Sequence, residues 1–188
     1  MGKKDNGIIM GIDPGSENRT GYAIFDTTNQ TYVDLGHCKE LSTPSIYKHY
    51  NCCMAILEDP NQDTNMRRLA MNIRKGNRSI EFGLKLANHL GKNMYCARLI
   101  KRLLTELQIR VVHVKPSERQ RADKPHPVFG KPMRIRAYSM PTKTNKRQFE
   151  QLTGYNKGSN EHSRDAATML WGKQMLYWQG RFKTQKIK

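Results

Sequence analysis

The sequence predicts an α/β fold, a five-stranded mixed sheet flanked by helices, and three observations lead to this prediction. Three apolar or β-branched stretches near the N-terminus are separated by short turns, which is typical of three antiparallel strands. A fourth and a fifth apolar stretch follow with a long helical pattern between them, so the last two strands should run parallel. A chain of 188 residues has the length of one domain with its own core.

Each strand candidate is a short apolar or β-branched run bounded by polar or turn-forming residues. The turn Thr27-Thr28-Asn29 is short enough to join the second and third candidates as a hairpin. The polar stretch 39–50 contains Pro44, and we expect it to hold little more than one helical turn. The five strand candidates span 7–13, 21–26, 30–38, 52–57 and 109–114.

Three helical patterns complete the predicted fold. In the longest, from Ser79 to about Leu107, apolar residues recur with the 3.6-residue period of a helix that packs on a sheet. A shorter helix is expected over 145–152, and a last one from about Ser159 to Trp178. The longest helix also carries small residues that permit close approach of another backbone: Gly83, Ala87, Gly91 and Ala97.

The charge balance indicates a polyanionic partner. Lysine and arginine number 33 against 16 acidic residues, which gives a net charge of +17. Repulsion between like charges disfavours a compact state, so this excess favours neutralisation by nucleic acid. The sequence has no apolar run that could span a membrane, no secretion signal, and four cysteines without metal-site spacing. We therefore expect a protein of the cytoplasm or of another reducing compartment that contains DNA, not a secreted one.

Basic residues are concentrated in two stretches of the single domain, 1–188. A segment over 116–142, interpreted as an insertion, combines prolines with positive charge and the aromatic residues Phe129 and Tyr138, which suits contact with a phosphate backbone. The tail over 180–188 is also basic. The candidate nucleic-acid contacts are Lys115, Arg119, Arg121, Lys131, Arg134, Arg136, Lys143, Lys146 and Arg147.

Two predicted strands end in the same way, with an apolar run, a carboxylate and a proline. Asp13 ends the first strand and Glu58 the fourth. Because a buried, unpaired carboxylate is costly, an acid in this position usually has a cation or a strong hydrogen-bond partner. An ordinary turn aspartate remains an alternative for Asp13. Asp59 could replace Glu58 as the candidate site residue, and Glu161 could replace its neighbour His162.

The last helix contributes a second polar pair. His162 and Asp165 are three residues apart in its first turn and therefore project from one face. A surface pair with no function is the common alternative. The partial positive charge of a helix N-terminus is expected to favour neutral imidazole, which is the metal-binding form.

Taken in order, these motifs resemble the RuvC-type Holliday junction resolvases of the RNase H-like nuclease superfamily. The resemblance is carried by GIDPG followed by TGYA, by the acid in AILEDP and by EHSRDAATML, and it extends over nearly the whole chain. It implies an RNase H-like fold and a structure-selective endodeoxyribonuclease. Such an enzyme cuts four-way DNA junctions by two-metal-ion hydrolysis, with paired nicks made by a homodimer.

The resemblance also implies roles for individual residues. Asp13 matches the first family carboxylate, Glu58 the second and Asp165 the last, while His162 falls where many members have aspartate. These four would hold two Mg²⁺ ions per active site, with Mn²⁺ able to substitute. Lys146 matches a family lysine near the scissile phosphate. In a dimer like that of the family, the helix from Ser79 would form the interface.

Three departures from the family pattern bear on the substrate. The stretch 39–50 is short for a helix, no aromatic wedge follows Glu58, and the basic segment 116–142 is long. They favour a broader set of branched DNAs. Two alternatives stay open, a nuclease of this fold acting on RNA or RNA/DNA hybrids and a non-catalytic protein that binds branched nucleic acid. The length and charge disfavour a sugar-kinase-like ATPase.

Overall fold

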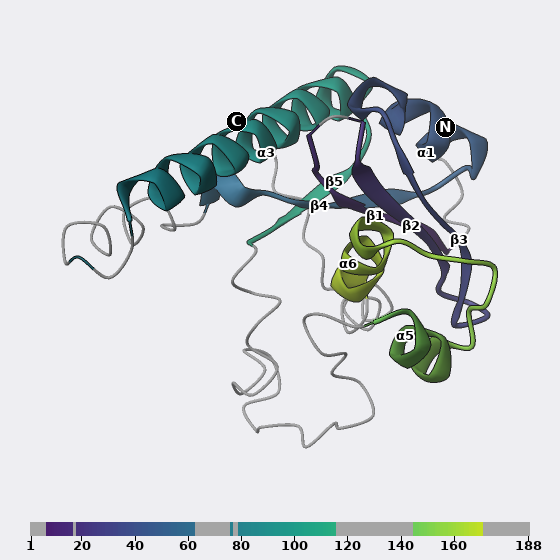
Figure 1. Cartoon of the computed structure of the whole chain (residues 1–188). Helices are drawn as coiled ribbons and strands as arrows, with labels where there is room; N and C mark the ends of the chain where they lie inside the picture. Colours follow the sequence, from purple (N-terminus) through teal and green to yellow (C-terminus); the bar gives the residue numbers. More distant parts are fainter. Residues whose placement is uncertain (1–6, 17, 63–75, 77–78, 116–144, 171–188) are drawn as a thin grey trace, which may run out of the picture.

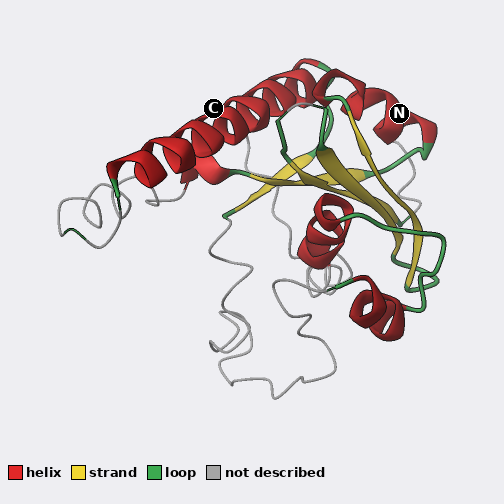
Figure 2. Cartoon of the chain, in the orientation of Figure 1, coloured by secondary structure: helices red, strands yellow, loops and turns green. Residues whose placement is uncertain are grey.

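The computed structural model describes residues 7–16, 18–62, 76, 79–115 and 145–170, which form one sheet with helices on both faces (Figures 1 and 2). The sheet has five strands in the order β3-β2-β1-β4-β5. β2 is antiparallel to β1 and β3, whereas β1, β4 and β5 are parallel. The predicted mixed sheet is therefore confirmed. The strands span Ile8–Asp13 (β1), Thr20–Asp26 (β2), Thr31–Cys38 (β3), Met54–Glu58 (β4) and Val111–Val114 (β5).

The central strands β1 and β4 are buried because helices cover both faces of the sheet. All residues of β4, and all but the first of β1, are buried, as continuous apolar runs predict. One face packs against α5 (Lys146–Thr153) and α6 (Glu161–Leu170). The opposite face packs against α1 (Thr43–His49) and α3 (Ile80–Glu106). The two faces are called the α6 face and the α3 face below.

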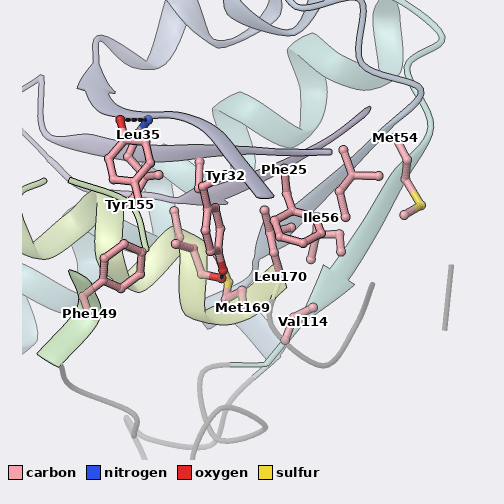
Figure 3. Packing of buried hydrophobic residues seen from close by; sticks show 14 residues of the cluster. Phe25, Tyr32, Leu35, Met54, Ile56, Val114, Phe149, Tyr155, Met169 and Leu170 are labelled. Atoms are coloured by element: carbon pink, nitrogen blue, oxygen red, sulfur yellow. Dashed lines mark hydrogen bonds between the residues drawn. The ribbon is translucent and has the colours of Figure 1, made fainter. Parts of the chain in front are cut away.

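Aromatic side chains fasten α5 and α6 to the edge strand β3 (Figure 3). The rings of Tyr32 and Phe149 have centroids 5.6 Å apart. Tyr32 is buried and donates its hydroxyl to the carbonyl of Ala167 in α6 at 2.8 Å. The hydroxyl of Tyr155, just beyond α5, accepts from the backbone N–H of Leu35 at 3.1 Å. β3 therefore holds both helices of the α6 face.

The segment 39–50 contains more helix than the sequence predicts. It holds a 3-10 turn, η1 (Glu40–Ser42), followed by the seven-residue helix α1. Pro44 lies in the first turn of α1, where its missing N–H group costs no hydrogen bond, so it begins the helix instead of breaking it. Tyr47 anchors α1 in the core. The expectation of little more than one helical turn was wrong.

The other helices begin where the sequence predicts. Ser79 caps α3, because its side chain accepts a hydrogen bond from the N–H of Phe82 at 3.2 Å. Asn145 and Gln148 form a capping box at the start of α5. α6 is described as far as Leu170; the predicted continuation to 178, the segment 116–142 and the tail 180–188 lie outside the described residues. None of the described helices is long and apolar enough to cross a membrane.

The two halves of α3 have different surroundings. Ile100 and Leu104, in the C-terminal half, are fully buried against the sheet. The N-terminal half extends past the sheet (Figure 1). There Ile80, Phe82 and Leu84 are exposed by 70%, 44% and 66%. One continuous helical pattern therefore provides a core helix at one end and an apolar surface at the other.

Candidate active site

Asp13 and Glu58 lie next to each other where β1 and β4 end. Ile12 and Leu57 are paired in register, so the residues that follow them are neighbours across the two parallel strands. Ile12 and Leu57 belong to the core of the α3 face. Because side chains alternate along a strand, Asp13 and Glu58 point to the α6 face. Both are buried, with 8% and 6% of their surface exposed.

Glycines allow α6 to lie directly on β1 and β2. A Cβ atom on Gly11 would collide with the carbonyl of Ala166, and one on Gly21 would collide with the carbonyl of His162. Gly21 is the register partner of Asp13. The first turn of α6 is therefore held beside Asp13. The motifs GIDPG and TGYA contain these glycines, but the sequence pattern alone does not show that they serve helix packing.

His162 is brought into contact with Asp13. Its Nδ1 atom lies 3.3 Å from Oδ2 of Asp13. This hydrogen bond raises the pKa of His162; burial acts to lower it, and the negative charges of Asp13, Asp165 and Glu161 raise it further. The position at a helix N-terminus predicts a lowered pKa and neutral imidazole, whereas the hydrogen bond to Asp13 and the neighbouring carboxylates shift the pKa of His162 in the opposite direction.

The turn between β1 and β2 is closed by Thr20, which the sequence did not single out. Its buried hydroxyl donates to the carbonyl of Gly15 at 3.3 Å and accepts from the N–H of Gly15 at 3.5 Å. A Cβ atom on Gly15 would collide with the carbonyl of Arg19. Pro14 is buried in the same turn. These contacts hold the backbone that follows Asp13 in one conformation.

Asp59 points away from the candidate site. It follows Glu58 by one residue, so the alternation of the strand turns it towards the α3 face. It accepts hydrogen bonds from the N–H of Asn61 at 3.1 Å, from Nδ2 of Asn61 at 2.9 Å and from Nε2 of Gln62 at 3.2 Å. Burial acts to raise the pKa of Asp59, but these hydrogen bonds lower it below its usual value. Asp59 therefore serves the η2 turn (Pro60–Gln62).

The remaining candidate ligands lie on the first turns of α6. Asp165 is half-buried one turn after His162, whereas Glu161 is exposed at the beginning of the helix. Carboxylates with one imidazole are donor types that suit Mg²⁺ or Mn²⁺. Among the described residues, however, no three His, Cys, Asp or Glu side chains are arranged closely enough to hold a metal ion.

The predicted basic contacts are only partly described. Lys146 is exposed at the start of α5, and its Nζ atom lies 3.8 Å from Oε1 of Glu150 in the same helix. Arg147 is exposed next to it, and Lys115 is exposed directly after β5. The other candidate contacts lie outside the described residues: Arg119, Arg121, Lys131, Arg134, Arg136 and Lys143.

The strand order, the strand directions and the helices on both faces define an RNase H-like fold. This fold is similar to that of Thermus thermophilus RuvC, both in a complex with a Holliday junction substrate and in a second structure of that protein. Each comparison has a TM-score of 0.52 and covers 93% of this chain; the identities are 10% and 12%, and 96% and 97% of the RuvC chains are covered. No family model and no curated protein matches the sequence. The fold predicted by resemblance is confirmed.

Proposed function

We propose that this protein is a metal-dependent endodeoxyribonuclease that resolves Holliday junctions and other branched DNA. One observation carries the proposal: Asp13 and Glu58 end adjacent parallel strands on the α6 face, and His162 contacts Asp13 from the first turn of α6. This arrangement occurs in a fold similar to that of RuvC, whose structure has been solved with a junction. Nuclease chemistry is therefore favoured over simple packing for these buried acids.

In this proposal, Asp13, Glu58, His162 and Asp165 hold two divalent metal ions, with Mg²⁺ preferred and Mn²⁺ able to substitute. When bound, the ions supply a nucleophilic hydroxide and stabilise charge on the phosphoryl group and the leaving oxygen. Asp13, on the middle strand, would be one of the residues that hold them. To hold a metal ion, the carboxylate of Asp13 would have to give up its contact with His162, and the imidazole would have to be neutral.

Basic residues bind the DNA backbone in this proposal. The net charge of +17 supports a large electrostatic contribution to affinity. Lys146 has a more specific function, to offset negative charge on the scissile phosphate or to orient the attacking water. To act there it has to leave the neighbourhood of Glu150. Because exposed ion pairs contribute little to stability, separating Lys146 from Glu150 costs little free energy.

A homodimer would place two active sites on opposed strands of a junction and give paired nicks. The exposed apolar residues Ile80, Phe82 and Leu84 of α3 support an interface there. Of the small residues in α3, Gly91 has open space around the position of a Cβ atom. Mass measurement on junction DNA tests this part of the proposal, and a monomer on the junction would contradict it.

The decisive experiment is cleavage of a labelled mobile four-way junction by wild type and Asp13→Asn, with Mg²⁺ or Mn²⁺. Linear duplex, flap and RNA/DNA hybrid substrates serve as controls. Symmetric nicks in the junction that vanish in Asp13→Asn, while binding persists, would support the proposal. Cleavage of the hybrid alone would contradict it and indicate a nuclease that acts on RNA.

A non-catalytic protein that binds branched nucleic acid is the second candidate. It is favoured by one observation, that the described acids and His162 do not form a group able to hold a metal as they stand. Junction binding by wild type without cleavage in either metal would establish it. Asp13→Asn would then leave junction affinity unchanged, because the residue would have no ligand to lose.

A further inference from the structure

We propose that His37 is a positioning residue, which fixes the start of α6 on the sheet and thereby holds His162 beside Asp13. The inference rests on the proposed function, because it assigns His37 to the same site. His37 is exposed near the end of β3. Its register partner on β2 is Gly21, and the partner of Gly21 on β1 is Asp13. The three residues therefore form one row across the sheet.

The contact between His37 and α6 is made through Asn160. Nδ2 of Asn160 lies 2.8 Å from Nδ1 of His37. Asn160 precedes α6, and its Oδ1 atom accepts a hydrogen bond from the N–H of Ser163 at 2.8 Å. The hydroxyl of Ser163 in turn accepts from the N–H of Asn160 at 3.0 Å. Asn160 is therefore both the cap of α6 and its connection to β3.

The cap fixes which atoms donate and which accept. Because Oδ1 of Asn160 faces the N–H of Ser163, its amide group cannot turn over without losing the cap. Nδ2 must then donate, and Nδ1 of His37 must accept. Neutral His37 consequently carries its ring proton on Nε2. The contact is directional, and it needs an acceptor at the δ position of residue 37.

His37 supplies the lateral support that Gly21 cannot give. A side chain at position 21 would collide with the backbone of His162, so only glycine fits there. Further along α6, the hydroxyl of Tyr32 holds the carbonyl of Ala167. Two residues of β3 therefore hold α6. Tyr32 binds the carbonyl of Ala167 within the helix, and His37 binds the cap residue Asn160. Without His37, the buried contacts keep α6 folded, but its first turn can shift relative to Asp13.

The test uses three variants of the full chain. His37→Ala removes the acceptor, whereas His37→Asn restores an oxygen acceptor at the δ position. His49→Ala is the matched control, because His49 is also an exposed histidine but lies on α1, on the α3 face. Calorimetry measures Mn²⁺ affinity without DNA, and junction affinity is measured without metal. Thermal unfolding reports stability, and amide exchange of Ser163 and Arg164 reports order at the start of α6.

We expect His37→Ala to weaken Mn²⁺ binding by about tenfold, the low end for a residue that orients a metal ligand through other groups. Exchange at Ser163 and Arg164 should accelerate, while metal-free junction affinity stays within about twofold, as its phosphate contacts are unaltered. His37→Asn should recover most of the Mn²⁺ affinity, and His49→Ala should match wild type.

Unchanged Mn²⁺ affinity and unchanged exchange in His37→Ala would overturn the inference. A uniform loss of stability in both His37 variants would also overturn it, because that is the result of a purely structural contact. If wild type neither binds Mn²⁺ nor cleaves junctions, the proposed function fails instead. The amide exchange then still decides whether His37 positions α6, since that measurement needs neither metal nor DNA.

Discussion

Glu58 and Asp59 are neighbours in the chain, yet they face opposite sides of the sheet. Glu58 lies beside Asp13 on the α6 face, where His162 approaches from a helix. Asp59 is on the α3 face, where Asn61 and Gln62 occupy its carboxylate with hydrogen bonds. The pleat of a strand therefore separates a candidate catalytic acid from a structural one.

The largest effect is expected for Glu58→Gln. Losing a metal ligand removes several kcal/mol of charge stabilisation, so junction cleavage should fall by about 10³-fold or more. Junction affinity without metal should not change. Single-turnover cleavage and metal-free binding measure the two quantities. Cleavage within tenfold of wild type would assign the metal to other acids.

Gly21→Ala should disturb the packing of α6 on the sheet. The added Cβ atom would collide with the carbonyl of His162, so α6 would have to move away from Asp13. We expect a loss of about 1–3 kcal/mol in unfolding free energy, as for overpacked cores. Denaturant unfolding measures it. Gly91→Ala, where a Cβ meets open space, is the matched control and should be neutral or slightly stabilising.

Asp59→Asn should affect stability and not chemistry. The amide keeps an acceptor for Asn61, but it loses the negative charge and the acceptor for Nε2 of Gln62, so we expect a destabilisation of about 1–2 kcal/mol with cleavage retained. The pKa of Asp59 is lowered in the folded protein, so its contribution is present above its unfolded pKa and is lost as pH falls through the folded value. The difference between wild type and variant should therefore shrink in acid. A difference that does not depend on pH would argue against a charged Asp59.

The smallest effect is expected for the pH dependence that His162 gives to stability and to Mn²⁺ affinity. Its raised pKa stabilises the metal-free protein below the unfolded pKa, and this contribution is lost as pH rises through the folded pKa. The pH dependence of metal affinity is expected to have the opposite sign, because the imidazole must lose its proton to bind a metal. Mn²⁺ affinity should then fall by up to about tenfold per pH unit below the raised pKa. His162→Asp should show a weaker dependence over about pH 6 to 8 in the same calorimetric titration.

The sheet and the two acids that end its strands can be predicted from the sequence because both follow from local patterns. Apolar runs define β1 and β4, and the acids directly follow them. Other features depend on contacts between distant parts of the chain. The raised pKa of His162 comes from Asp13, and the cap of α6 reaches His37, far away in sequence. The sequence favours Glu58 over Asp59 because Glu58 directly follows the apolar run, but the hydrogen bonds that occupy Asp59 are seen only in the fold.

Pro44 shows a different limit. A proline in the sequence predicts a break, but its effect depends on its position within a helix, and Pro44 lies in the first turn of α1. The function of Lys146 also stays a prediction, since an exposed lysine that pairs within its own helix has the same local sequence as one that reaches a phosphate.

If α3 forms the dimer interface, as proposed, its exposed apolar end and the net charge of the protein respond to ionic strength in opposite ways. Mutual repulsion from a net charge of +17 opposes self-association in dilute buffer, the condition in which the proposed binding to DNA phosphates would be strongest. Added salt screens that repulsion, so contact between the exposed side chains of Ile80, Phe82 and Leu84 on two molecules would be less opposed, while attraction to DNA would weaken. Under the proposed function, self-association through α3 and affinity for DNA would therefore respond to salt with opposite signs.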